Sequence, residues 1–349
     1  MNSKSPGGRT GELLRLVSFN QIQFPINFMK ILITGVTGFV GSHLAEYCLK
    51  KPKIKVYGTV LSHHLGDELK RIEHIKDKIE LLECNLTNRV AVERVLRISK
   101  PDKIFHLAAQ SFVPNSWKSP EDTLSNNIMS ELNVLEVVRE LKLNPVIVIA
   151  GSSEEYGLVL ENELPVKETN PLRPLSPYAV SKITQEKLAF QYHKSYGLKT
   201  VLTRFFNTEG PGRGQDFVTS NFAKQIAEIE KGKREPIIYV GNLEAKRDFS
   251  DVRDMVRAYW LASEKCKFGE PYNVCSGKTR TIKSVLDLLL SLSKVKNIEI
   301  RPDPERMRPS DVPILLGDCS KFRKATGWKP KIPFEKTMLD LLNYWRKNV

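Results

Sequence analysis

The stretch ILITGVTGFVGSHLAEYCL, residues 31–49, joins an apolar strand to an amphipathic helix through a turn that holds three glycines. In the spacing G-x-x-G-x-x-G, Gly35 allows a tight turn, Gly38 lets a pyrophosphate approach the backbone, and Gly41 lets helix and strand pack closely. The amides that open the helix attract phosphate. The stretch therefore predicts the first strand, turn and helix of a dinucleotide-binding domain.

Beyond this stretch, short β-branched apolar runs alternate with helical patterns. We predict strands at 30–34, 54–60, 79–83, 103–108, 146–151 and 199–204. We predict helices between them at 39–50, 89–98, 126–142 and 178–196. Strands that are apolar throughout are typical of a parallel sheet buried on both faces. The alternation predicts an α/β fold, a Rossmann-type doubly wound sheet that binds ligands beyond the C-terminal ends of its strands.

After residue 205 the alternation loosens, which indicates a smaller C-terminal lobe that caps the crevice. We predict helices there at 217–231, 250–265, 281–293 and 334–347. Runs at 237–240 and 272–275 could return to the large sheet. The expected organisation is an extension at 1–28, an NAD(P)-binding domain at 29–205 to which 237–260 and 270–276 return, and a substrate-binding lobe at 206–349.

Composition narrows the class of protein. The formal net charge is +14, but the lysines and arginines are spread along the chain without a basic-aromatic cluster, which argues against nucleic-acid binding. The basic balance fits a solvated surface or an anionic substrate. No apolar run is long enough to span a bilayer. Five widely spaced cysteines without a C-x-x-C pair predict a reducing cytoplasm, and neither disulfides nor a zinc or other metal site.

The first 28 residues differ from the rest, with an early Pro-Gly-Gly break and an apolar run interrupted by Arg15. They make a poor secretory signal. Because Met29 stands directly before the first strand, we expect the folded protein to begin there, and removal of 1–28 to leave activity intact.

The end of the second strand bears on which dinucleotide binds. NAD-binding domains usually carry an acidic residue there, which bonds the ribose 2′-hydroxyl. Here Thr59, Val60 and Leu61 offer none, so a 2′-phosphate would meet no carboxylate. Ser62, His63 and His64 could bond it, although the two histidines fit a solvated loop equally well. The sequence favours NADP(H) and leaves NAD(H) open, and Asn85 is placed to bond the adenine edge.

A catalytic group is indicated by SPYAVSK, residues 176–182, where Tyr178 and Lys182 share one face of a helix. Lowering a tyrosine pKa from about 10 to neutrality needs roughly 4 kcal/mol. One ammonium about 4 Å away supplies energy of that order at an effective dielectric constant of about 20. Ser152, after the predicted strand 146–151, would hold the same substrate oxygen.

From Met29 onward the chain resembles the extended short-chain dehydrogenase/reductases that act on nucleotide-diphosphate sugars. The resemblance rests on TGVTGFVG (34–41), HLAAQS (106–111), GSSEEYG (151–157), SPYAVSK, RFFNTEGPGR (204–213), GNLEAKRDFSDVRDM (241–255), RPSDVPILLGD (308–318) and TGWKP (326–330). FVT at 217–219 and GNLEAKRDF make it most similar to the GDP-mannose branch. The resemblance implies a cytoplasmic homodimer, or a tetramer, built through helices 126–142 and 178–196.

The resemblance also implies roles for individual residues. The implied catalytic residues are Ser152, Glu154, Tyr178 and Lys182. The implied cofactor-binding residues are Gly35, Thr37, Gly38, Phe39, Val40, Gly41, Ser62, Asn85, Leu86, Leu107, Ala108, Ala109 and Asn127, with Tyr178 and Lys182. The implied substrate-binding residues are Ser111, Ser153, Asn207, Arg213, Phe217, Val218, Lys224, Arg247, Arg308 and Asp311. Arginine suits this role because its planar guanidinium binds phosphate in bidentate fashion.

Two reactions of this branch compete. Glu154 aligns with the base that removes a sugar C5 proton in the 4,6-dehydratases. Phe39-Val40, Leu61-Ser62 and VTSN at 218–221 instead look like GDP-4-keto-6-deoxy-D-mannose reductases, whose product here would be a GDP-6-deoxyhexose of the GDP-D-rhamnose type. The sequence therefore favours the reductase, with the dehydratase as the alternative. A non-catalytic NADP or nucleotide-sugar binder is disfavoured by the intact Ser152, Tyr178 and Lys182 set.

Overall fold

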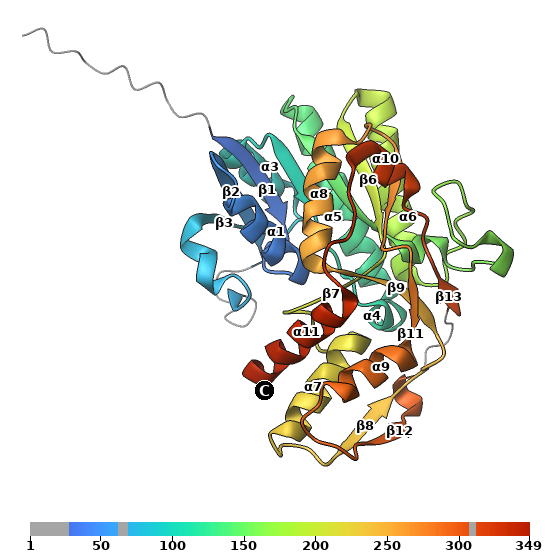
Figure 1. Cartoon of the computed structure of the whole chain (residues 1–349). Coiled ribbons are helices and arrows are strands. Elements are labelled where there is room, and N and C mark those ends of the chain that lie inside the picture. Colours follow the sequence, from blue (N-terminus) through green and yellow to red (C-terminus); the bar gives the residue numbers. More distant parts are fainter. Residues whose placement is uncertain (1–27, 62–68, 307–311) are drawn as a thin grey trace, which may run out of the picture.

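The computed structural model describes residues 28–61, 69–306 and 312–349 (Figure 1). Its centre is a sheet of seven strands in which every neighbouring pair is parallel. The strands are β1 (Met29–Thr34), β2 (Ile54–Val60), β3 (Ile79–Glu83), β4 (Lys103–His106), β5 (Val146–Ser152), β6 (Lys199–Phe205) and β10 (Pro271–Val274). Their order is β10-β6-β5-β4-β1-β2-β3, so the chain reverses direction across the sheet between β1 and β4. The predicted doubly wound fold is confirmed.

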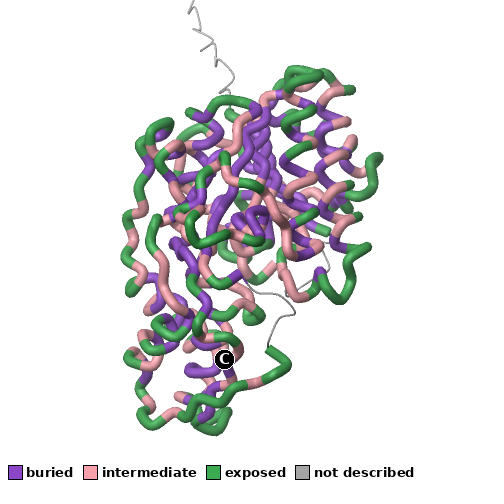
Figure 2. Tube along the Cα trace, turned by 90° about the vertical axis from the view of Figure 1, so that its right-hand side faces the viewer, coloured by how far each residue is buried: buried purple, intermediate pink, exposed green. Residues whose placement is uncertain are grey.

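Helices cover both faces of this sheet. One core unites α1 (Phe39–Leu49) and α8 (Val252–Lys265) with one face, and another unites α3 (Arg89–Ser99), α5 (Pro120–Glu140) and α6 (Pro177–Tyr196) with the other. Figure 2 shows the buried strands running through the middle of this larger part. Because both faces are covered, the central strands β1, β4 and β5 are mostly apolar.

Local signals fix where these helices begin and end. α6 begins where the Ser176 side chain accepts from the Ala179 amide and Pro177 occupies the first turn. It ends at Gly197, whose φ of 73° is left-handed. α5 begins at Pro120, six residues before the predicted start, after Ser119. The predicted helix at 126–142 was therefore too short at its N-terminal end.

The smaller lobe has its own core between α7 (Val218–Glu230), α9 (Ile282–Ser291) and α11 (Phe334–Asn348), at the lower end of the molecule in Figure 1. β8 (Ile237–Val240) pairs there with β12 (Glu299–Pro302). The expected return of 237–240 to the large sheet is wrong, because Ile238 and Val240 pack into the smaller core. The run at 272–275, by contrast, does join the large sheet, as β10.

Short elements connect the two parts. A small sheet is formed by β7 (Asn207–Glu209), β9 (Lys246–Asp251), β11 (Thr279–Thr281) and β13 (Ile314–Leu315). The remaining elements are η1 (Glu73–Lys78), α4 (Val113–Lys118), η2 (Ser153–Tyr156), η3 (Glu161–Glu163), η4 (Pro304–Arg306) and α10 (Ser320–Thr326). None of the described helices is long and apolar enough to cross a membrane.

Candidate active site

A cavity of about 1420 Å³ opens beyond the C-terminal ends of the sheet strands. Its lining comes from the glycine turn and the ends of β2, β4 and β5 on one side, and from α7 of the smaller lobe and β9 of the small sheet on the other. It therefore spans the point where the strand order reverses, which is where ligands of doubly wound sheets bind.

The glycine turn packs too closely against its neighbours to hold side chains at Gly35 and Gly41. Gly35 has a φ of 67°, and a Cβ atom there would lie 3.0 Å from the Ala108 backbone. A Cβ atom at Gly41 would lie 2.2 Å from the carbonyl oxygen of Gly35, so helix and turn pack too closely for any side chain. Gly38 stands at the N-terminus of α1 and lines the cavity. The turn therefore leaves bare backbone and a helix N-terminus facing the space that a dinucleotide phosphate needs.

Most of the predicted cofactor-binding residues line this cavity. They are Gly35, Thr37, Gly38, Phe39, Val40, Gly41, Asn85, Leu86, Leu107, Ala108 and Ala109, with Tyr178 and Lys182. Ser62 lies outside the described residues.

Asn127 departs from its predicted role, because it is fully buried and is not among the lining residues. Its Oδ1 accepts from the Gln110 amide at 2.8 Å and its Nδ2 donates to the Ser181 hydroxyl at 2.9 Å. Through these bonds Asn127 fixes Gln110, which does line the cavity.

The predicted catalytic residues meet at the cavity wall. Ser152 ends β5, and its hydroxyl lies close enough to the Tyr178 phenol on α6 to lower the pKa of that phenol. One turn further along α6, Lys182 donates to the carbonyl oxygen of Ala150 at 2.8 Å. The phenol and the lysine are 8% and 3% exposed.

Burial dominates the ionisation of this group. Burial raises the pKa of Tyr178 well above its usual value. The Ser152 hydroxyl opposes this rise most, and the Arg213 guanidinium opposes it less. Lys182 lies with its Nζ 5.9 Å from the ring centroid. The net direction is opposite to the expected lowering of the tyrosine pKa, because the loss of solvent outweighs the neighbouring charges. The phenol therefore holds its proton at neutral pH.

The two adjacent glutamates of η2 diverge. Glu154 lines the cavity. Glu155 is fully buried, and its Oε1 accepts from the Ser152 amide at 2.7 Å, closing a capping box with the Ser152 side chain. Glu154 thus faces the cavity, while Glu155 holds Ser152 in place.

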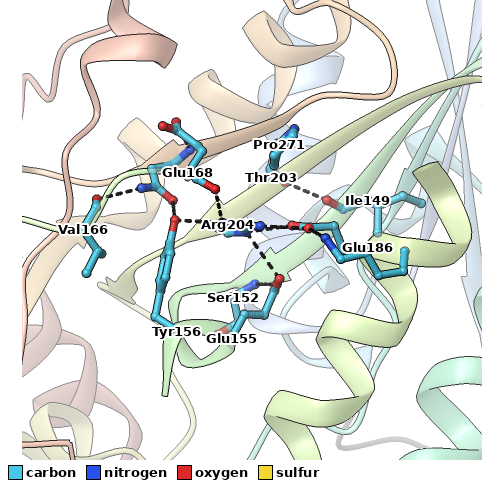
Figure 3. Close-up of polar contacts among 12 residues, drawn as sticks. Ile149, Ser152, Glu155, Tyr156, Val166, Glu168, Glu186, Thr203, Arg204 and Pro271 are labelled. Atoms are coloured by element: carbon cyan, nitrogen blue, oxygen red, sulfur yellow. Dashed lines mark hydrogen bonds and ion pairs between the residues drawn. The ribbon is translucent and has the colours of Figure 1, made fainter. Parts of the chain in front are cut away.

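Behind the capping box lies a buried ionic network centred on Arg204 of β6 (Figure 3). Its guanidinium contacts Glu155 at 3.4 Å and donates to both carboxylate oxygens of Glu186 at 2.7 and 2.8 Å. It also donates to the Tyr156 hydroxyl at 2.9 Å. The network ties η2 to β6 and α6, and so fixes the strand end that carries Ser152.

The predicted substrate-binding residues are only partly brought together. Those that line the cavity are Ser111, Ser153, Asn207, Arg213, Phe217, Val218 and Arg247. Arg213 lies 3.4 Å above the Phe217 ring centroid and 3.9 Å from the Glu209 carboxylate. The Phe217 ring and the Glu209 carboxylate thus both stabilise the Arg213 guanidinium in this position.

Lys224 does not belong to this set. Its Nζ donates to Gln215 at 2.5 Å, and it borders a separate surface hollow with Trp345. It lies two turns into α7 and does not line the cavity, so the structure does not bring it together with the other predicted residues. Arg308 and Asp311 lie outside the described residues.

Arg71 is a cavity residue that sequence reasoning missed. Its Nε donates to the Gly212 carbonyl at 3.0 Å and its Nη1 to the Thr37 carbonyl at 3.5 Å, so it bridges the loop between β7 and α7 and the glycine turn. It lies eleven residues beyond the end of β2, at a spacing that no motif describes. Only the folded chain reveals it.

Comparisons with known proteins agree with this geometry. The sequence profile of the GDP-mannose 4,6 dehydratase family matches residues 32–341. The GDP-6-deoxy-D-mannose reductase of Pseudomonas aeruginosa is 32% identical over 92% of this chain and 98% of its own length. The GDP-mannose 4,6-dehydratase of Yersinia enterocolitica is 34% identical over 90% of this chain and 92% of its own length.

Solved structures give the same result. The structure of RMD from Pseudomonas aeruginosa complexed with NADPH is similar at a TM-score of 0.78 and 30% identity, over 92% of this chain and all of the other. The Thermus thermophilus UDP-glucose 4-epimerase in complex with NAD reaches a TM-score of 0.80 at 30% identity, with the same coverage. The chain therefore belongs to the GDP-mannose 4,6-dehydratase family of the extended short-chain dehydrogenase/reductases.

Proposed function

We propose that this protein is an NADP(H)-dependent oxidoreductase that reduces GDP-4-keto-6-deoxy-D-mannose at C4 to a GDP-6-deoxyhexose. The observation that carries the proposal is the buried Tyr178 side chain, which lies beside Ser152 at the wall of the cavity, where burial raises the pKa of its phenol. Reduction of a ketone needs a proton donor, and burial keeps this phenol in the donor form. The similarity to the Pseudomonas aeruginosa reductase supports the same direction.

Each of these cavity residues has its own role in the proposed reduction. Tyr178 donates its proton to the C4 oxygen while Ser152 holds that oxygen by a hydrogen bond. Lys182 stabilises the phenolate that forms when the proton leaves. Arg213 and Arg247 bind the diphosphate of the nucleotide sugar, with Phe217 and Val218 beside them. A bound nicotinamide supplies the hydride.

The glycine turn and the cavity fit a dinucleotide, and the charge near the turn favours NADP(H). Arg71 faces the cavity beside Thr37, and it is close enough to Arg213 for the two guanidinium charges to repel. With Arg213 assigned to the substrate, Arg71 is the cation beside the glycine turn that can attract an anion such as a 2′-phosphate. NAD(H) remains the alternative cofactor.

A 4,6-dehydratase is the second candidate, and Glu154 favours it. This carboxylate lines the cavity close enough to Tyr178 to raise the pKa of the phenol. A base there could accept the C5 proton of a 4-keto sugar. The similarity to the Yersinia enterocolitica dehydratase agrees.

Two assays separate these functions. In the first, the protein is given GDP-mannose and the cofactor, and a 4-keto product is sought. In the second, it is given GDP-4-keto-6-deoxymannose and NADPH, and the loss of NADPH absorbance is followed. We expect turnover in the second assay. Turnover only in the first would establish the dehydratase instead, and binding without turnover in either would mark a non-catalytic binder.

We also propose that the protein acts in the cytoplasm as a homodimer through α5 and α6. Both helices expose large apolar side chains, which are Met129 on α5 and Val180, Phe190 and Tyr196 on α6. Exposed apolar groups gathered on neighbouring helices are typical of a subunit interface. A tetramer would need a second interface beyond these helices.

A further inference from the structure

Tyr259 on α8 carries a polar group that none of the functions above uses. The residue is only 4% exposed, yet it lines the cavity. No hydrogen bond joins its hydroxyl to another residue in the part of the chain that the structure describes. The hydroxyl is also not among the fully enclosed polar atoms that lack a partner, so its remaining exposure opens into the cavity. A buried hydroxyl without a partner calls for a physical explanation, and a bound ligand would supply one.

The ring of Tyr259 is fixed beside the catalytic group. It stacks on the Phe205 ring, with the two centroids 3.9 Å apart and the two planes 18° apart. Phe205 ends β6, where it is the register partner of Ser152 at the end of β5. Side chains of register partners project from the same face of a sheet, because side chains alternate along every strand. Phe205 therefore holds the Tyr259 ring at the same face and the same level of the sheet as Ser152.

Tyr259 and Tyr178 reach these strand ends from different sides. α8 packs with α1 on one face of the large sheet, while α6 packs on the other. Both phenols line the same cavity. Burial, and after it the nearby Tyr178, raise the pKa of Tyr259 well above its usual value. The Tyr259 hydroxyl therefore keeps its proton, and it can both donate and accept a hydrogen bond.

The nicotinamide ring of the cofactor is the ligand group that fits this place. In hydride transfer the reacting atoms lie about 3 to 3.5 Å apart, so the ring lies beside the sugar carbon whose oxygen Tyr178 and Ser152 hold. The phosphates of the same dinucleotide lie at the glycine turn before α1, which packs on the same face as α8. The hydrogen-bonding group of the nicotinamide ring is its carboxamide, which offers one acceptor and one NH2 donor. A neutral hydroxyl matches both.

We propose that the Tyr259 hydroxyl binds the carboxamide of the nicotinamide and thereby fixes which face of the ring is turned to the sugar. Tyr259 takes no part in proton transfer in this role, which remains with Tyr178. The proposal rests on the proposed function only in placing the nicotinamide beside Tyr178, and the contact itself can be measured without turnover.

Other hydroxyl groups near these strand ends already have partners within the protein. Thr208 Oγ1 donates to the Phe206 carbonyl at 3.2 Å. The Tyr156 hydroxyl donates to Asn273 Oδ1 at 2.7 Å. Tyr259 differs from them because its ring is held by stacking while its hydroxyl is left for a ligand.

The direct test compares two ligands in wild type and Tyr259→Phe, which keeps the stacked ring and removes only the hydroxyl. The dissociation constant of NADPH is measured by its fluorescence, without any sugar. We expect NADPH to bind Tyr259→Phe roughly 2- to 12-fold more weakly, the usual effect of one neutral hydrogen bond. 2′-Phospho-ADP-ribose, which is the same molecule without the nicotinamide, should bind both proteins equally by calorimetry. Equal NADPH affinities, or an equal loss for both ligands, would overturn the proposal.

Two controls separate this contact from a structural role. The ligand-free Tm of Tyr259→Phe should match that of the wild type, because the lost hydroxyl bonds nothing in the protein. A lower ligand-free Tm would assign the hydroxyl to the fold and contradict the proposal. Tyr272→Phe alters another buried tyrosine, which is 2% exposed, lies outside the cavity and accepts from the Lys267 amide at 3.0 Å. It should keep the wild-type affinity for both ligands.

Kinetics give the matching functional readout. In whichever assay the wild type turns over, Tyr259→Phe should lower kcat/KM for the dinucleotide by about the factor seen in binding, and leave the KM of the sugar nucleotide unchanged. A raised KM for the sugar nucleotide, with the dinucleotide unaffected, would place the hydroxyl against the sugar and contradict the proposal. A wild type inactive in both assays would refute the proposed function, and the two-ligand comparison would still decide the role of Tyr259.

Discussion

Glu154 and Glu155 are neighbours in the chain, yet the first lines the cavity and the second is locked behind Ser152. The difference decides which one can contact a substrate. A buried acid that is bonded to a backbone amide and an arginine is committed to structure, while an acid on the cavity wall can meet a ligand. Of these two glutamates, only Glu154 therefore bears on the choice between reductase and dehydratase.

For Glu154→Gln we expect reduction of the 4-keto sugar to stay within about threefold of the wild type, since this reaction removes no C5 proton. A general base is worth about 10² to 10⁴ in rate, so a loss of that size would identify Glu154 as a base and favour the dehydratase. The measurement is kcat in both assays. Glu161→Gln, a nearby acid that does not line the cavity, is the control.

Tyr178→Phe removes the proposed proton donor and keeps the ring. We expect kcat to fall by about 10² to 10⁴, the usual contribution of a positioned acid, while NADPH binding measured by fluorescence is retained. Tyr196→Phe on the same helix, 52% exposed, should keep full activity. Unchanged turnover in Tyr178→Phe would remove the phenol from the mechanism.

At the scale of helices and strands, the sequence predicts what local chemistry controls. Ser176, Pro177 and Gly197 mark the ends of α6 in the sequence as they do in the structure. The Ser-Pro pair at 119–120 carries the same kind of start signal for α5, which the expectation of a start at 126 overlooked. The partner of β8, in contrast, is set by tertiary packing, and a four-residue apolar run does not encode it.

The faces of helices are harder to predict than their ends. Lys224 falls within the predicted helix at 217–231, yet its side chain contacts Gln215 and Trp345. Asn127 falls in the right helix, but it contacts Gln110 and Ser181 instead of the cavity. In both cases the element was predicted, while the direction of the side chain depended on how the helix packs.

The exposed faces of α5 and α6 make a prediction about assembly. Phe190 on α6 is 43% exposed, and an aspartate there would bury an unpaired charge if the helices meet across a dimer. We expect Phe190→Asp to shift the protein from dimer to monomer in light scattering coupled to gel filtration. Phe268→Asp, at a similarly exposed phenylalanine outside both helices, should remain dimeric. A dimeric Phe190→Asp would place the interface elsewhere.

For the whole molecule, the doubly wound parallel sheet and the place of the cavity followed from the alternation of strands and helices, because such a sheet binds ligands beyond the C-terminal ends of its strands. The cavity itself needs both lobes. Arg71 follows β2 of the large sheet and donates to Gly212 in the loop that leads to α7. No spacing in the sequence brings these two segments together, so the residue that joins them could not be predicted.

Because Arg71 joins two distant segments at the cavity, its effect on ligand binding can be measured through the stability of the whole molecule. A ligand that binds only the folded chain raises the free energy of unfolding by about 4 kcal/mol at a thousand times its Kd, and less when Kd rises. If Arg71 bonds the 2′-phosphate, NADPH should raise the Tm of the wild type more than NADH does at equal concentration.

A hydrogen bond to a charged group is worth about 1.5 to 3 kcal/mol. Arg71→Gln should therefore weaken the binding of NADPH by roughly 10- to 150-fold and leave the binding of NADH nearly unchanged. The Tm shifts of the two dinucleotides should then converge. Arg97→Gln, at an exposed arginine of α3 paired with Glu93, controls for the loss of charge. If NADPH keeps its advantage in Arg71→Gln, the 2′-phosphate is read by another residue, and Arg71 serves only to hold the Gly212 loop against the glycine turn.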